Sequence, residues 1–117
     1  MQYILLAYSD PTYFAQQSPH DQKTTLAAYE SFMEALQKSG AYVGSNRLQP
    51  TTTATTVRVA NGKTQVLNGP YVETKEQLGG YFLIDVPDLD AALAWAARCP
   101  GSAHGTMEVR PIWAMRG

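Results

Sequence analysis

Two segments of the chain carry apolar side chains at consecutive positions rather than at alternate ones. In Tyr3–Tyr8 every residue is apolar or aromatic, and in Tyr81–Val86 only Asp85 is polar. A strand with this pattern presents apolar side chains to both sides of its sheet and is buried on both sides. We therefore expect both segments to be interior strands of a sheet that is covered on both faces.

A helical pattern follows the first of these strands. Within residues 26–36 apolar side chains recur every three or four positions, which places them along one face of a helix. Ser18-Pro19 is typical of an N-cap followed by the first helical residue, and Gly40 supplies the residue that often ends a helix in a left-handed turn. The pattern predicts a helix over about Pro19–Ser39.

The strongest local signal is a β-hairpin. Asn61-Gly62 separates the β-branched run Thr55–Val59 from Lys63–Leu67. Both turn residues tolerate the positive φ angles of a type I′ turn, which joins two antiparallel strands. We expect this hairpin to be inserted between a strand at Ala41–Leu48 and the strand at Tyr81–Val86.

The C-terminal part of the chain predicts a second helix and a last strand. Asp88 caps an apolar stripe of leucine and alanine that runs for roughly ten residues and ends at Cys99-Pro100. A flexible loop, Gly101–Gly105, leads into the strand Gly105–Trp113. Before the preceding strand, Thr74–Leu78 is expected to form a short helical turn.

The order of these elements defines the expected fold. With the hairpin treated as an insertion, they give the βαββαβ pattern of the ferredoxin-like fold. This is a single α+β domain over residues 1–117, in which an antiparallel sheet carries both helices on one face. The opposite face then has no cover from its own chain. Because homodimers with isologous interfaces are the commonest oligomers, we expect a homodimer in which two sheets face each other.

Composition and charge limit the classes of function that we expect for the protein. The chain has 117 residues, of which 44% are hydrophobic, and a formal net charge of -1. No cluster of Lys and Arg is available to bind phosphates, so we expect no direct contact with nucleic acid. No apolar run approaches the roughly 20 residues that cross a bilayer, and the basic region of a signal peptide is missing. We therefore expect a cytoplasmic protein without membrane contact.

The usual motifs for metals and cofactors are missing from the sequence. Cys99 is the only cysteine, which excludes an internal disulfide, and no Cys/His spacing is typical of structural zinc. There is no glycine-rich nucleotide loop and no metalloprotease or serine-hydrolase signature. We therefore expect neither a metal nor a cofactor, and the candidates for chemistry are polar groups at the ends of elements.

His104, Glu108 and Arg110 are the candidates near the last strand. His104 stands in the glycine-containing loop, where an imidazole that exchanges protons near neutral pH can act as an acid or base over a cleft. The alternative is an exposed loop histidine without a role. Glu108 and Arg110 share one strand face, as an ion pair that lines a dimer cleft or as a structural interface pair. In the first case Glu108 is a second candidate base.

Three further residues are candidate ligand contacts. Glu73 and Lys75 follow the turn at Gly69-Pro70 and combine a carboxylate with an amine, which suits the orientation of a small acidic or phenolic ligand. A solvated turn explains the same residues without a ligand. Tyr29 lies on the apolar stripe of the first helix, where its ring is expected in the core and its hydroxyl is a candidate to reach a cleft.

Three stretches of the sequence resemble the YCII-related family, specifically its DGPF branch. They are Asn68–Tyr81, Cys99-Pro100 and Met107–Ile112, and the resemblance covers nearly the whole chain. It implies a dimeric α+β barrel built from ferredoxin-like protomers. Some members of the wider family are described as enzymes with a histidine and an aspartate in the cleft, including a dehydrochlorinase. As aligned, that histidine falls on Tyr29, and Asn68 stands at the aspartate that gives the branch its name.

The sequence supports two hypotheses from different classes. In the first, the protein binds a small acidic or phenolic compound, as a ligand-binding protein or an enzyme. Glu73, Lys75 and Arg110 then orient the compound, and His104 or Glu108 accepts a proton. In the second, the protein is a non-catalytic interaction module. The resemblance implies, as one example, a regulatory partner of an extracytoplasmic-function sigma factor.

Overall fold

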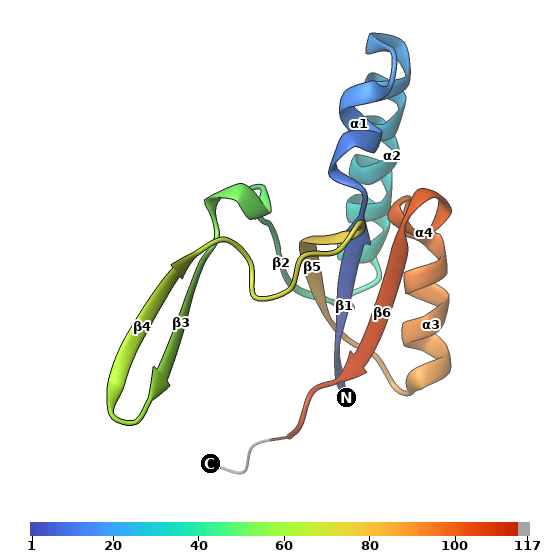
Figure 1. The fold of residues 1–117 in the computed structure, drawn as a ribbon. Coiled ribbons are helices and arrows are strands. Elements are labelled where there is room, and N and C mark those ends of the chain that lie inside the picture. Colours follow the sequence, from blue (N-terminus) through green and yellow to red (C-terminus); the bar gives the residue numbers. More distant parts are fainter. Residues whose placement is uncertain (115–117) are drawn as a thin grey trace.

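The structure, a computed structural model, describes residues 1–114. Figure 1 shows a four-stranded sheet with helices beside it and a two-stranded hairpin that projects away from it. The elements are β1 Gln2–Ser9, α1 Pro11–Gln16, α2 Pro19–Lys38, β2 Tyr42–Arg47, the 3₁₀ helix η1 Thr51–Thr53, β3 Thr55–Ala60, β4 Lys63–Asn68, β5 Gln77–Asp85, α3 Leu89–Arg98, α4 Gly101–His104 and β6 Thr106–Pro111.

The sheet has the strand order β2-β5-β1-β6, and every neighbouring pair in it is antiparallel. With the β3–β4 hairpin set aside, the first and third strands lie in the middle and the second and fourth at the edges. This is the order that a βαββαβ chain adopts when its helices cover one face of the sheet. The predicted α+β, ferredoxin-like fold with an inserted hairpin is therefore confirmed.

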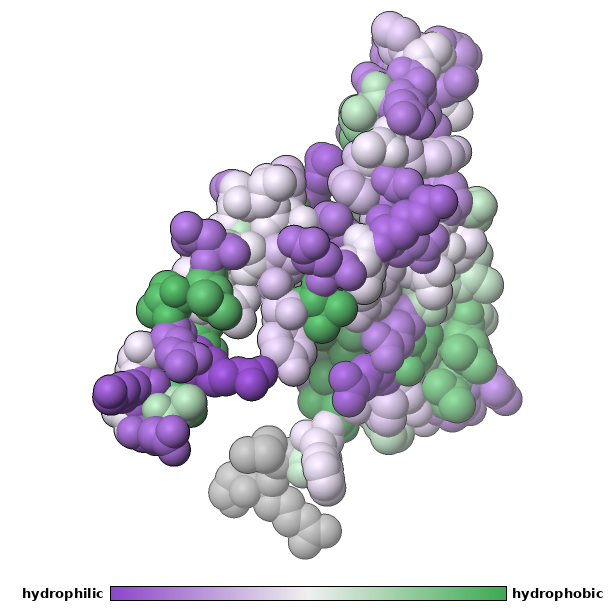
Figure 2. All heavy atoms as spheres, viewed as in Figure 1, coloured by the Kyte–Doolittle hydropathy of each residue, from purple (hydrophilic) through white to green (hydrophobic). Residues whose placement is uncertain are grey.

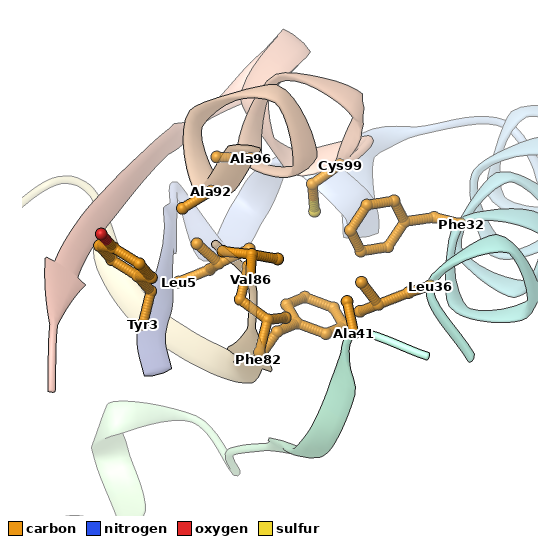
Figure 3. Close-up of a cluster of buried hydrophobic side chains, with 11 residues drawn as sticks. Tyr3, Leu5, Phe32, Leu36, Ala41, Phe82, Val86, Ala92, Ala96 and Cys99 are labelled. Atoms are coloured by element: carbon orange, nitrogen blue, oxygen red, sulfur yellow. The ribbon is translucent and has the colours of Figure 1, made fainter. Parts of the chain in front are cut away.

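The core lies between one face of the sheet and the helices α2 and α3. On β1 the side chains of Tyr3 and Leu5 are 3% and 0% exposed, and on β5 their neighbours Ile84 and Phe82 are also buried. Figure 3 shows side chains from both helices pointing toward these strand residues. Phe32 of α2 meets Phe82 edge to face, with 5.2 Å between the ring centroids. We call this the inner face of the sheet.

The opposite, outer face of the sheet also carries apolar side chains, as the sequence predicts. Ile4, Leu6 and Leu83 alternate with the core residues along β1 and β5 and are only half-buried. Since alternate side chains point to opposite faces of a strand, these three lie on the side away from α2 and α3. Their apolar surface is available to another molecule.

Helix α2 is longer than the core that it covers. Its Ser18 N-cap hydroxyl accepts a hydrogen bond from the Asp21 amide at 3.1 Å, as the capping pattern predicts. Phe32 and Leu36 in its C-terminal half are buried, whereas Leu26 near its middle is 49% exposed. The helix therefore extends beyond the packed part of the sheet. Among the described residues, no helix is both long and apolar enough to span a membrane.

The hairpin forms where Asn61-Gly62 predicts it. The φ angles of these residues are 52° and 73°, the left-handed region that a type I′ turn requires. Val57, Val59 and Val66 share one face of the hairpin and are 60–64% exposed. Figure 2 shows this gathering of hydrophobic residues on the projecting arm. An isolated two-stranded hairpin has little stability of its own, so its apolar face suits contact with another surface.

The structure corrects two local expectations and contains one helix that the sequence did not predict. Thr74–Leu78 is not a helical turn, because Gln77 and Leu78 already pair with β1 as the start of β5. Asp10-Pro11 begins the helix α1, in which the Asp10 carboxylate caps the Thr12 amide at 2.9 Å. Gly101–His104 is the short helix α4 rather than a flexible loop, and the Gly105 amide donates to the Gly101 carbonyl at 2.8 Å.

Gly105 allows β1 and the end of α4 to approach each other. A Cβ at this position would clash with the Tyr8 carbonyl oxygen and lie 3.2 Å from the Gly101 carbonyl oxygen. These are backbone atoms that cannot rotate away, so Gly105→Ala is expected to lower the free energy of unfolding by about 1–3 kcal/mol. Thermal unfolding followed by circular dichroism measures the loss.

Gly79→Ala is the matched control for Gly105→Ala. A Cβ at Gly79 would meet no atom closer than the Ala7 carbonyl oxygen at 4.0 Å. A distance of 4.0 Å is an ordinary van der Waals contact, so the substitution should cause little strain. The melting temperature of Gly79→Ala should therefore stay within about 2 °C of the wild-type value. Equal effects of the two substitutions would contradict the close approach at Gly105.

Candidate functional site

A cleft of about 700 Å³ lies between the helices α1 and α2 and the open end of the sheet. Its walls come from the end of β1, the start of α1, the middle of α2, the end of β2, the start of β5 and the end of α4. Most of the surface that lines the cleft is apolar, as in small-molecule sites of similar volume. The lining residues are Ala7, Ser9, Asp10, Pro11, Tyr13, Phe14, Thr25, Leu26, Tyr29, Met33, the stretch 45–51, the stretch 77–82 and His104.

The floor of the cleft is created by small residues on the inner face of the sheet. Leu5 pairs with Phe82 inside the core, and one step further along the same face Ala7 pairs with Gly80. The change from large to small side chains leaves space above the sheet where α2 continues overhead. Gly80 cannot be enlarged, since a Cβ would lie 2.9 Å from the Asn46 carbonyl oxygen. The cleft is thus built into the sequence of β1 and β5.

Tyr29 projects from α2 into the wall of the cleft. A Cβ on Gly101 would lie only 2.8 Å from the Tyr29 hydroxyl oxygen, so the glycine leaves room for the hydroxyl. Burial raises the pKa of Tyr29 to about 12, with a further contribution from Cys99 and an opposing one from the positive charge of Arg47. The hydroxyl makes no hydrogen bond within residues 1–114. Tyr29 is therefore a neutral donor at physiological pH and a poor base.

His104 reaches the same cleft from the end of α4. Its ring stacks on the ring of Tyr13 from α1, with 4.4 Å between centroids and 11° between planes. Nδ1 and Nε2 are both buried, and neither has a hydrogen-bond partner within residues 1–114. A buried polar atom without a partner costs about 1–3 kcal/mol, so a ligand that bonds to this ring recovers that cost.

Two charged residues of the cleft were not among the sequence candidates. Arg47, the last residue of β2, is exposed and makes no salt bridge within residues 1–114. Asp10 is already engaged as the cap of α1, and hydrogen bonds from the Thr12 amide and hydroxyl lower the pKa of its carboxyl. The signals were present, since Arg47 ends a predicted strand and Asp10-Pro11 repeats the cap pattern of Ser18-Pro19.

Glu73 and Lys75 lie in a second, adjacent hollow of about 470 Å³. This hollow and the main cleft share Thr51 and Gln77, whose side chains are joined by a hydrogen bond of 2.6 Å. The positive charge of Lys75 contributes to lowering the pKa of Asp10 at the rim of the cleft. The two predicted ligand contacts are therefore neighbours of the cleft rather than part of its lining.

Glu108 and Arg110 lie on the outer face of the sheet, where β6 pairs with Leu6 and Ile4 of β1. The Tyr8 hydroxyl donates to Glu108 Oε1 at 3.2 Å. Burial and the nearby Glu108 carboxylate raise the pKa of Tyr8. No salt bridge joins Glu108 to Arg110 within residues 1–114. Their place fits an interface between sheets, and it is on the far side of the sheet from the main cleft.

The structure therefore brings together Tyr29 and His104, and it separates the other four candidates. Glu73 and Lys75 share the adjacent hollow, while Glu108 and Arg110 share the outer face. The roles assigned to all six stay predictions. Within residues 1–114, no three His, Cys, Asp or Glu side chains come together in a group able to hold a metal ion.

Comparison with known proteins agrees with the architecture of an α+β domain built on an antiparallel sheet. The model of the YCII-related domain matches residues 1–116, and the chain belongs to this family. An uncharacterised protein of Rhizobium meliloti (strain 1021) is 35% identical over 114 residues, which are 96% of this chain and 92% of that protein.

A solved structure is similar in fold. It is the 5-chloro-2-hydroxyhydroquinone dehydrochlorinase of Burkholderia phenoliruptrix AC1100 in complex with 2,5-dihydroxybenzoquinone. The TM-score is 0.56 at 12% sequence identity, and the match covers 97% of this chain and 94% of that chain. The likeness shows that the two chains share a fold.

Proposed function

We propose that this protein binds a small acidic or phenolic compound in the cleft between α2 and the sheet. The observation that carries the proposal is the pair Tyr29 and His104. Both residues line one largely apolar cleft, and neither the Tyr29 hydroxyl nor the two buried His104 nitrogens has a hydrogen-bond partner within residues 1–114. Apolar walls with a few convergent polar groups are typical of small-molecule sites.

The cleft is large enough to admit an aromatic ring, and its chemistry suits one that carries hydroxyl groups. A ring with hydroxyl groups receives a hydrogen bond from the neutral Tyr29 hydroxyl and exchanges one with His104, while its faces pack on the apolar walls. The fold neighbour supports this class of compound, since that protein acts on a chlorinated hydroxyhydroquinone. In this proposal His104 is also the candidate proton acceptor, if a reaction follows binding.

The proposal is tested by titrating the protein with 2,5-dihydroxybenzoquinone and 4-hydroxybenzoate in a calorimeter. We expect one site per chain for at least one of the two compounds. Tyr29→Phe should weaken that binding by roughly tenfold, because it removes one hydrogen bond from a desolvated site.

Tyr71→Phe is the matched control, since Tyr71 is 76% exposed and lies outside the cleft lining. This variant should bind as the wild type does. Failure of the wild-type protein to bind either compound at millimolar concentration would contradict the proposed function. Equal affinity of the Tyr29→Phe and Tyr71→Phe variants for the compound would show that the binding site is not in the cleft.

We also propose that the protein works as a homodimer joined through the outer face of the sheet. The half-buried apolar side chains of Ile4, Leu6 and Leu83 support this assembly, because they lie on the face of the sheet away from α2 and α3. In such an interface Glu108 and Arg110 meet the partner, where their charges are paired or hydrated. Their predicted contribution to a ligand site then belongs to the space between the two sheets.

A second candidate function is an interaction module, such as a regulatory partner of an extracytoplasmic-function sigma factor. The exposed apolar face of the hairpin favours it, because Val57, Val59 and Val66 have no cover. A sigma factor that copurifies with the wild-type protein but not with Val57→Lys would support this function. Equal recovery with both proteins would contradict the role of the hairpin.

Two finer assignments accompany the proposal. We assign the chain to the DGPF branch, with Gly69-Pro70 at the conserved part of the branch motif and Asn68 in place of its aspartate. We also assign it to the cytoplasm. Its one cysteine, Cys99, is a free and buried thiol whose pKa is raised by burial, which suits a reducing compartment.

A further inference from the structure

The charges around the main cleft are distributed unevenly. Arg47 is the one Lys or Arg side chain in the lining, and Asp10 is the one carboxylate. The Asp10 carboxylate is occupied by the Thr12 amide and hydroxyl, whereas the Arg47 guanidinium makes no salt bridge or side-chain hydrogen bond within residues 1–114. At its positive end the cleft therefore has a charge available to a ligand, whereas the negative charge at the other end is already hydrogen-bonded.

These two ends lie on opposite sides of β5. Arg47 ends β2, and Asp10 directly follows β1, in a sheet of order β2-β5-β1-β6. Two strand spacings separate the backbones of β2 and β1, roughly 10 Å. His104 lies on the β1 side, because α4 contacts β1 and β6. A benzene ring with substituents at opposite positions has the length to extend across this width.

We infer that the cleft selects an aromatic ring that carries an anionic group at one end and a hydroxyl at the other, with the anion bound by Arg47 and the hydroxyl directed to His104. This inference rests on the proposed function and adds the charge and the orientation of the ligand. A planar guanidinium binds a carboxylate through two parallel hydrogen bonds, which fixes direction as well as affinity. The Asp10 carboxylate repels an anion placed the other way round. Arg47 is thus the specificity-determining residue of the site.

The test compares 4-hydroxybenzoate with 4-hydroxybenzamide, a probe of nearly the same shape in which a neutral amide replaces the carboxylate. Calorimetric titration of the wild-type protein should show the carboxylate bound at least tenfold more tightly than the amide. Arg47→Gln should remove this preference. It should lower the affinity for the carboxylate probe at least tenfold and leave the affinity for the amide probe within about twofold of the wild-type value. Arg58→Gln, on the exposed hairpin outside the cleft, should keep the wild-type preference.

The outcomes separate this inference from the proposed function. Equal affinity of the wild-type protein for the two probes would overturn the role of Arg47 and leave the phenolic site standing. A preference that persists in Arg47→Gln would also overturn it, because another cation would then bind the carboxylate. If the protein bound neither of the two probes and did not bind 2,5-dihydroxybenzoquinone either, the proposed function would be overturned, and the assignment of Arg47 with it.

Discussion

His104→Phe is expected to raise the melting temperature of the protein and to abolish binding in the cleft. The histidine ring is held by its stack on Tyr13, while both of its nitrogens are buried without a partner. Phenylalanine keeps the ring and the stack and removes the two unsatisfied polar atoms. Residues that bind ligands often reduce stability in this way, because the cost of their polar groups is recovered only in the complex.

The size of the expected effect follows from the two nitrogens. Each buried, unpaired polar atom costs about 1–3 kcal/mol, so the gain in unfolding free energy should be about 2 kcal/mol or more. For a domain of this size that corresponds to a rise of several degrees in melting temperature, roughly 8 °C or more. Differential scanning calorimetry measures the stability, and titration with the phenolic probes measures the binding.

His20→Phe serves as the control for this experiment, since His20 is exposed in the first turn of α2. It should change neither stability nor binding appreciably. A lower melting temperature for His104→Phe would show that the imidazole nitrogens have partners in the assembled protein. Undiminished binding by the same variant would remove His104 from the site.

Much of the fold could be predicted because its signals are local. The two-sided strands, the capped helix α2 and the Asn61-Gly62 hairpin each depend on residues that are near neighbours in sequence. The errors arose where the local signal was short or was overridden. Six residues of α1 are too few for a periodic pattern, and Gln77 joins β5 because it pairs with Ser9 across the sheet.

The candidate site was predicted only in part, for a physical reason. The stripe on α2 is periodic throughout, and its spacing alone does not distinguish Phe32, which packs in the core, from Tyr29, which lines the cleft and was a candidate only because of its hydroxyl. That difference arises because Ala7 and Gly80, from two distant strands, leave the floor empty. Likewise the burial of His104 depends on Tyr13, which is far away in the sequence.

Leu6→Lys is expected to convert the proposed dimer into a monomer that keeps its fold. Leu6 lies on the outer face, directly opposite Glu108 on β6. In a separate chain the new ammonium group stays in water beside that carboxylate, and opposite charges at paired strand positions are mildly stabilising. Between two sheets the same charge loses its water, which costs several kcal/mol and should raise the dissociation constant of the dimer by about 100-fold or more.

Sedimentation velocity of the wild type and of two lysine variants decides between the alternatives. Leu93→Lys is the matched control, because Leu93 is 46% exposed on α3, away from the outer face. The wild type and Leu93→Lys should sediment as dimers at micromolar concentration, and Leu6→Lys as a monomer with unchanged circular dichroism. A dimer that survives Leu6→Lys would shift the interface elsewhere, and the exposed valines of the hairpin are then the next surface to test. A monomeric wild type would mean that the apolar outer face is left uncovered or meets a different protein, and the interaction-module hypothesis would gain from that result.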